Sequence, residues 1–322
     1  MEIHLFLNNI TKGSDFMEVI EIINNIGDKF TFYKKLDDGS VLVKTDDERF
    51  TLLKVSYGDY VNCNVYKPLN TASSRIGLTY LNNKHELMTI VEYNNSADIY
   101  VEFIDVHHAK VHTTFNNFKK GEVNNPYRRS YYGVGYLGEG YKPPRGDKAM
   151  NCWRNMLNRV YNKNYLDLHP TYLGCSVCDE WLNFQNFYTW FNNNYYEFDD
   201  QVMCLDKDIL VKGNKIYSPD TVVFVPQFIN KLFTKRDNDR GDYPIGITKN
   251  HGRYYASCSV YNINTKKVMS VNLGSYNTPT EAFLVYKEAK ELNIRKIAEA
   301  CKNKIPDKLV QAMLSYTVDI ND

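Results

Sequence analysis

One stretch, Cys204 to Leu232, constrains the fold of this chain most, because strand, turn and helix patterns follow one another within it. Leu205 to Leu210 alternates apolar and charged residues, as a half-buried strand does. Lys212 to Lys215 marks a turn, and the β-branched and aromatic run Val222 to Val225 predicts a second strand. Pro226 suits the first turn of a helix, where a missing N–H is tolerated. The stretch therefore predicts a ββα unit, a compact frame that can hold one divalent cation against a phosphate.

Five short segments occur in a fixed order around this stretch: CWRNMLNRVYN, VCDEWLNFQNFYTW, LDKDIL, YSPD and a closing Asn230. In this order they resemble the HNH endonucleases found in phage genomes and mobile introns. The resemblance implies a domain that cuts duplex DNA with one divalent metal, held by Asp206 and Asn230. Both residues are oxygen donors, which favours Mg²⁺ or Mn²⁺.

The chain departs from this family at two positions. The family's first motif is Asp-His, with the His as general base, but here Lys207 follows Asp206; the family's middle Asn falls at Thr221. A lysine acts as a base near neutral pH only where its surroundings lower its pKa by several units. Asp208 and His169 are the alternative residues for activating water. The expected catalytic residues are therefore Asp206, Lys207, Asp208 and His169. The sequence is compatible with a site that cuts DNA and with one that does not.

After a charged segment, residues 243 to 322 read as three short strands and one helix. Thr278 caps that helix, and Glu281 completes a capping box. The matching pieces are Gly246-Ile247, Gly252 to Ala256, Leu273 to Tyr276, and Glu281 to Phe283 with Ala289. In this order they resemble the APETALA-two/ERF DNA-binding domain, which lays its sheet in the major groove.

That resemblance implies that side chains on one face of the sheet contact DNA, where Arg can bind guanine through two hydrogen bonds. The expected DNA-binding residues here are Lys249, Arg253, Tyr255, Ser257, Lys266 and Lys267. The alternative is a solvated sheet face without a partner.

The first 126 residues contain an internal near-repeat. Thr31 to Asp47 aligns without a gap with Thr89 to Asp105, and both read as strand, polar turn, strand. Repeated short strands with turns predict two small β-barrel or β-meander modules. These modules form either an arm that contacts DNA or a protein partner, or a structural appendage.

Residues 127 to 148 combine glycines, prolines, tyrosines and basic residues, which predicts an extended, partly mobile linker. Basic side chains neutralise phosphates and aromatic rings stack on bases, so this composition favours contact with nucleic acid. The residues assigned to DNA are Arg128, Arg129, Arg145 and Lys148. The alternative is a solvated hinge whose tyrosines pack on neighbouring domains.

The composition as a whole gives no sign of nucleic-acid binding, because the 322 residues carry a formal net charge of +1. Any positive surface must therefore be local. No apolar run is long enough to span a membrane, and the odd number of cysteines favours reduced thiols and a cytoplasmic location. Cys175 and Cys178 form a lone Cys-x-x-Cys that Cys204 and His169 could complete, but one pair is a weak signal, so zinc is not expected.

These patterns predict an α+β, multidomain DNA-binding protein. Its parts are paired β modules (1–126), a basic linker (127–148), an HNH-like domain (149–233), a second linker (234–242) and a sheet-readout domain with a helical tail (243–322). The leading hypothesis is a phage-type HNH homing endonuclease that nicks or cuts duplex DNA. One alternative is a catalytically inactive DNA-binding regulator or anti-host factor on the same scaffold, and another is a protein-binding inhibitor without a DNA role.

Overall fold

The computed structural model describes residues 21–46, 52–67, 75–234 and 243–322. The chain divides into two compact units, with the boundary between Arg128 and Arg129. Helices and sheets both contribute to the chain, so its class is α+β. None of the helices in the described ranges is long and apolar enough to cross a membrane.

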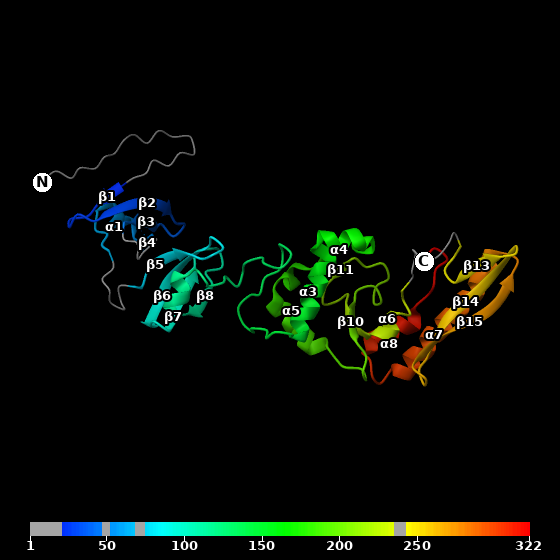
Figure 1. Ribbon diagram of the computed structural model, residues 1–322. Helices are drawn as coiled ribbons and strands as arrows, with labels where there is room; N and C mark the ends of the chain where they lie inside the picture. Colours follow the sequence, from blue (N-terminus) through cyan, green and yellow to red (C-terminus); the bar gives the residue numbers. More distant parts are fainter. Residues whose placement is uncertain (1–20, 47–51, 68–74, 235–242) are drawn as a thin grey trace. The chain divides into compact units, whose positions relative to one another are not determined.

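The first unit is a meander of eight antiparallel strands that pair in sequence order (Figure 1). The strands are β1 (Glu21–Ile23), β2 (Lys29–Lys35), β3 (Val41–Thr45), β4 (Leu52–Val55), β5 (Leu78–Leu81), β6 (Leu87–Asn95), β7 (Asp98–Phe103) and β8 (Lys110–Thr113). Two short helices, α1 (Tyr57–Val61) and α2 (Phe115–Lys119), follow β4 and β8. No ladder between described strands joins β8 back to β1, so these strands form an open sheet.

The near-repeat in the sequence is a repeat in the structure. Four strands and one short helix recur in each copy, and one asparagine makes the same bond in both. Asn24 Nδ2 donates to the Val65 carbonyl (2.8 Å) and Asn82 Nδ2 to the Val123 carbonyl (3.1 Å), in each case 41 residues further along the chain. The two copies nevertheless form one sheet, because β4 pairs with β5.

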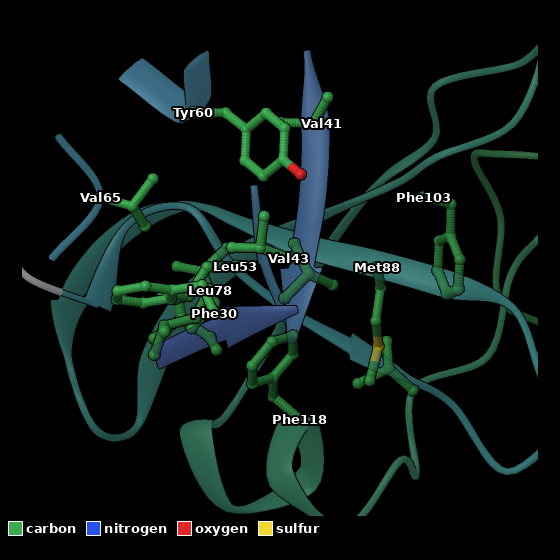
Figure 2. Packing of buried hydrophobic residues seen from close by; sticks show 14 of the residues in the cluster. Phe30, Val41, Val43, Leu53, Tyr60, Val65, Leu78, Met88, Phe103 and Phe118 are labelled. Carbon is green, nitrogen blue, oxygen red and sulfur yellow. The ribbon is translucent and has the colours of Figure 1, made fainter. Parts of the chain in front are cut away.

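One hydrophobic cluster runs through both copies of the repeat (Figure 2). Phe30 and Val43 of the first copy belong to the same cluster as Leu78 and Phe118 of the second. Each such side chain contributes roughly 1.5–3 kcal/mol when it is buried. The copies therefore stabilise one another instead of forming two independent modules.

The second unit contains the remaining elements, which fall into three small sheets and their helices. In chain order they are α3 (Lys148–Tyr161), α4 (Lys163–Leu168), η2 (Pro170–Tyr172), β9 (Ser176–Val177), η3 (Asp179–Leu182), α5 (Phe184–Asn194), β10 (Met203–Asp206), β11 (Ile216–Tyr217), β12 (Val223–Pro226), α6 (Gln227–Asn230), β13 (Ile247–Asn250), β14 (Arg253–Asn262), β15 (Lys267–Tyr276), α7 (Pro279–Cys301) and α8 (Asp307–Ser315). The sheets pair β10 with β12, β9 with β11, and β13 to β15 in order.

The Gly- and Tyr-rich segment does not behave as the expected extended linker. It packs on α3 and α5, where the ring of Tyr141 stacks on that of Tyr188 at 4.1 Å. Gly138 has φ 69°, and a Cβ there would clash with the side chain of Asn183, so glycine is required at this close approach. The alternative interpretation, tyrosines packed on a neighbouring part of the chain, describes the observed contacts.

A second hydrophobic cluster joins the ββα part to the C-terminal helices. Its fully buried members come from β12, α6, α7 and α8 and are Val225, Ile229, Ile294, Ala298, Leu309 and Met313. Phe228 of α6 also stacks on Tyr261 of β14 at 4.6 Å. The first half of α7 instead packs under the three-stranded sheet through Ala282, Phe283 and Tyr286. One long helix therefore belongs to two cores and holds the ββα part and the sheet in one unit.

Candidate active site and nucleic-acid interface

The predicted strand–turn–strand–helix unit is formed by β10, β12 and α6. β10 pairs antiparallel with β12, with Asp206 opposite Val223, and α6 follows β12 directly. The first strand is shorter than the sequence pattern suggests, because it ends at Asp206 instead of Leu210. The Asn230 side chain lies close enough to the Cys204 thiol to oppose the rise in its pKa that burial causes. Cys204 and Asp206 are two residues apart on one strand, so they share a face, and Asp206 and Asn230 both lie beside Cys204.

The Asp206 carboxylate explains why the strand stops. Its Oδ1 atom accepts the backbone N–H groups of Asp208 and Ile209, both at 2.8 Å, which turns the chain out of the strand. No donor from the described residues reaches the other oxygen, Oδ2. Burial raises the pKa of Asp206, and the two backbone N–H groups oppose that rise. Asp206 is half-buried, and its Oδ2 atom has no hydrogen-bond partner among the described residues.

Lys207 is held inside the loop that follows. Its Nζ donates to Asp208 Oδ2 (2.7 Å) and to the Asn214 carbonyl (2.9 Å), and Asn214 Nδ2 donates back to the Lys207 carbonyl (2.9 Å). The side chain is almost fully buried. Lys207 therefore closes the hairpin loop, and its ammonium offers protons instead of accepting one. Asp208, the neighbouring candidate for activating water, accepts the hydrogen bond from Lys207 in this contact.

His169 lies at the edge of an aromatic cluster. It is exposed at the end of α4, with its ring 4.3 Å from that of Tyr165, and Tyr165 in turn lies 5.8 Å from Tyr172. Asp206 and Lys207 are both close enough to affect the ionisation of Tyr172. Through Tyr165 and Tyr172, His169 therefore belongs to the same neighbourhood as Asp206. The side chains of His169 and Asp206 are not in direct contact.

Arg159 of α3 is the residue that sequence reasoning missed. Its guanidinium lies 5.9 Å from the centre of the Tyr172 ring and is close enough to Tyr217 and to Cys204 to affect their ionisation. No carboxylate among the described residues forms an ion pair with it. The helical spacing of Cys152, Met156 and Arg159 puts Arg159 on an inward face, and this is the signal that could have found it.

The two residues that the sequence assigned to a metal, Asp206 and Asn230, each carry a side-chain oxygen, the donor type that Mg²⁺ and Mn²⁺ prefer. Within the described ranges no three His, Cys, Asp or Glu side chains gather as a metal-binding group. Cys175 and Cys178 are unpaired thiols packed beside the aromatic core of α3 and α5.

The three-stranded sheet has one covered and one open face. Ala256 and Cys258 of β14 are buried against α7, so Arg253, Tyr255 and Ser257 lie on the opposite face. The Arg253 guanidinium is held across the strands, with Nε 3.2 Å from Ser275 Oγ and a second nitrogen 3.1 Å from Asn277 Oδ1. No Asp or Glu occurs between residues 243 and 280, so the sheet is locally positive although the whole chain is nearly neutral.

The other predicted DNA-binding residues of the sheet lie elsewhere. Lys249 is opposite Tyr254 and contacts its ring at 5.2 Å, which puts it on the same side as α7. Lys266 and Lys267 lie at the hairpin between β14 and β15, and Lys266 Nζ is 3.7 Å from Asp199. Of the sheet residues assigned to DNA, the open face therefore carries Arg253, Tyr255 and Ser257, whereas Lys249 lies on the covered side and Lys266 and Lys267 lie at the hairpin.

The cations of the Gly- and Tyr-rich segment fall in both units. Arg128 is the last residue of the first unit, where it forms an ion pair with Glu86 (3.4 Å). In the second unit, Lys148 Nζ is 2.6 Å from Glu197, and Arg129 and Arg145 are exposed. Contact of these four residues with DNA stays a prediction.

Comparisons with protein-family models, with curated proteins and with solved structures find no match for this chain.

Proposed function

We propose that this protein binds duplex DNA and nicks or cuts it at the Asp206 site, as an HNH-type endonuclease does. The observation that supports this most directly is the open Oδ2 atom of Asp206 on a ββα hairpin, next to Asn230. Arg159, an arginine without a carboxylate partner among the described residues, lies in the same neighbourhood. A carboxylate that can hold a metal, beside a guanidinium that has no carboxylate partner among the described residues, is suited to a phosphodiester. A phosphodiester needs both metal and cationic contacts.

Each residue has a separate role in this proposal. Asp206 and Asn230 hold Mg²⁺ or Mn²⁺, and such an ion neutralises charge on the phosphate and the leaving 3′ oxygen. Arg159 binds a non-bridging phosphate oxygen. His169 is the remaining side chain for taking a proton from the attacking water, because Lys207 and Asp208 bond each other in the loop.

The C-terminal sheet supplies the duplex contact in this proposal. Its open face presents Arg253 between Ser275 and Asn277, which keeps the guanidinium extended over the strands. A preorganised arginine on a sheet without acidic residues suits contact with the edge of guanine in the major groove, as in the APETALA-two/ERF domain that this part resembles.

A second candidate is a DNA-binding regulator that does not cut. The contacts of Lys207 favour this second candidate. The position that holds the general base in the HNH family is here a lysine that bonds Asp208 and the Asn214 carbonyl within the loop. In this case Asp206 and Arg159 contact the DNA backbone without catalysing a reaction.

A nicking assay separates the two candidates. Supercoiled DNA is incubated with the protein and Mg²⁺ or Mn²⁺, and the Asp206→Asn variant is compared with Asp200→Asn, a substitution at an exposed aspartate. The endonuclease predicts that Asp206→Asn lowers nicking by more than the roughly 10- to 100-fold that loss of an outer-shell metal partner costs. Salt-dependent binding without nicking under either metal supports the regulator, and an absence of salt-dependent DNA binding contradicts both.

A further inference from the structure

A cleft of about 640 Å³ lies between α6 and the edge of β14. It exists because β13 is short and pairs with β14 only as far as Ala256. The next residue, Ser257, donates its backbone N–H to the Gly246 carbonyl at 2.9 Å. Backbone groups of alternate residues point to the same edge of a strand, so the N–H groups of Ser259 and Tyr261 point into the cleft. The edge therefore offers hydrogen-bond donors beyond the point where pairing with β13 stops.

Among the residues that the structure describes, the charged side chains that line the cleft are those of three lysines, Lys231, Lys266 and Lys290. Lys290 forms no ion pair or hydrogen bond with another described residue, and burial lowers its pKa. A partly buried ammonium without a partner is unfavourable, and an anion in the cleft would relieve that cost.

The cleft lies between the two surfaces that the proposed function uses. Lys231 directly follows Asn230 and is close enough to Cys204 to affect the ionisation of its thiol, beside Asp206. Ser257 and Tyr261 belong to the strand that carries Arg253. A DNA strand that runs from the sheet to the Asp206 site therefore passes this cleft.

We propose that the cleft between α6 and β14 binds a backbone phosphate of the bound DNA strand through Lys231, Lys290 and the free N–H groups of β14. This inference deepens the proposed function and rests on it. The cleft gives affinity without sequence preference, because it contacts the phosphate and not the bases. It also sets the path of the strand between the sheet and the cleavage site.

The experiment measures the affinity for a duplex oligonucleotide by fluorescence anisotropy over a series of salt concentrations. Each lost phosphate contact lowers the slope of log affinity against log salt by about 1. We expect that decrease for Lys231→Gln and for Lys290→Gln, and a wild-type slope for Lys290→Arg. Lys296→Gln, at an exposed position on α7, is the matched control and should leave the slope unchanged.

Three results would overturn this inference. If the slope is unchanged in both glutamine variants while the wild-type protein binds DNA, the cleft does not bind a DNA phosphate. The proposed function is then unaffected. A slope that falls equally in Lys296→Gln assigns the effect to general charge. A Lys290-dependent rise in melting temperature with inorganic phosphate alone, without any change in the DNA slope, assigns the cleft to a free anion.

Discussion

The shared core of the second unit predicts that a substitution in α8 destabilises the ββα part, which is distant from α8 in sequence. Leu309 is fully buried in the cluster that contains Val225 and Ile229. Leu309→Ala removes buried methyl groups from a site lined on several sides, so the surroundings can collapse only in part. Such substitutions cost about 2–5 kcal/mol, a large fraction of the roughly 5–15 kcal/mol that stabilises a typical domain. Leu284→Ala, on an exposed position of α7, is the matched control and should cost less than about 0.5 kcal/mol.

Tryptophan fluorescence during urea unfolding measures this coupling. All three tryptophans, Trp153, Trp181 and Trp190, lie on or beside α3 and α5, far along the chain from α8. If the two parts unfold together, Leu309→Ala moves the tryptophan transition to a lower urea concentration. The shift then corresponds to the full loss in the free energy of unfolding. A tryptophan transition that Leu309→Ala leaves in place would refute the reasoning, because α3 and α5 would then unfold independently of the core that α8 shares with the ββα part.

Three further predictions follow from single contacts. Gly246→Ala should lower the melting temperature of the unit, since Gly246 has φ 79° and a Cβ there would clash with the ring of Tyr286; Ser257→Ala in the same part should have a small effect. Asn82→Ala should destabilise the first unit by about 1–3 kcal/mol in urea unfolding, because it leaves buried backbone groups of the repeat without their partner. Burial raises the pKa of Asp206, so the folded state binds this proton more tightly than the unfolded state does. The resulting stability is complete below the ordinary Asp pKa and is lost as the pH rises through the raised value; melting curves of Asp206→Asn should lack that acid-range slope.

Local patterns in the sequence were sufficient for most of the secondary structure. The gapless alignment of Thr31 to Asp47 with Thr89 to Asp105 predicted the repeat, because the same residue types make the same turns in both copies. The capping box at Thr278 is present in the structure with both of its bonds. These features depend on neighbours within a few residues, which periodicity can detect.

Contacts that depend on how loops and strands fold were beyond the sequence patterns. Glycines between 127 and 148 suggested an extended linker, but at Gly138 the missing side chain instead permits close packing on Asn183. Lys207 follows Asp206 where the HNH family that this segment resembles has its base, and only the fold of the loop brings the Asn214 carbonyl to its ammonium. The face of Lys249 likewise depends on its register with Tyr254. Each of these outcomes is decided by tertiary partners that the sequence does not name.

The most direct test of the proposed endonuclease site is a crystal structure of the protein with duplex DNA and Mn²⁺, with the metal located by its anomalous scattering. The account predicts one peak within coordination distance of Asp206 Oδ2 and the Asn230 amide oxygen, with Arg159 on the adjacent phosphate. It also predicts that the face of the sheet carrying Arg253 contacts the duplex. A metal bound elsewhere, or DNA bound on the face covered by α7, would contradict it.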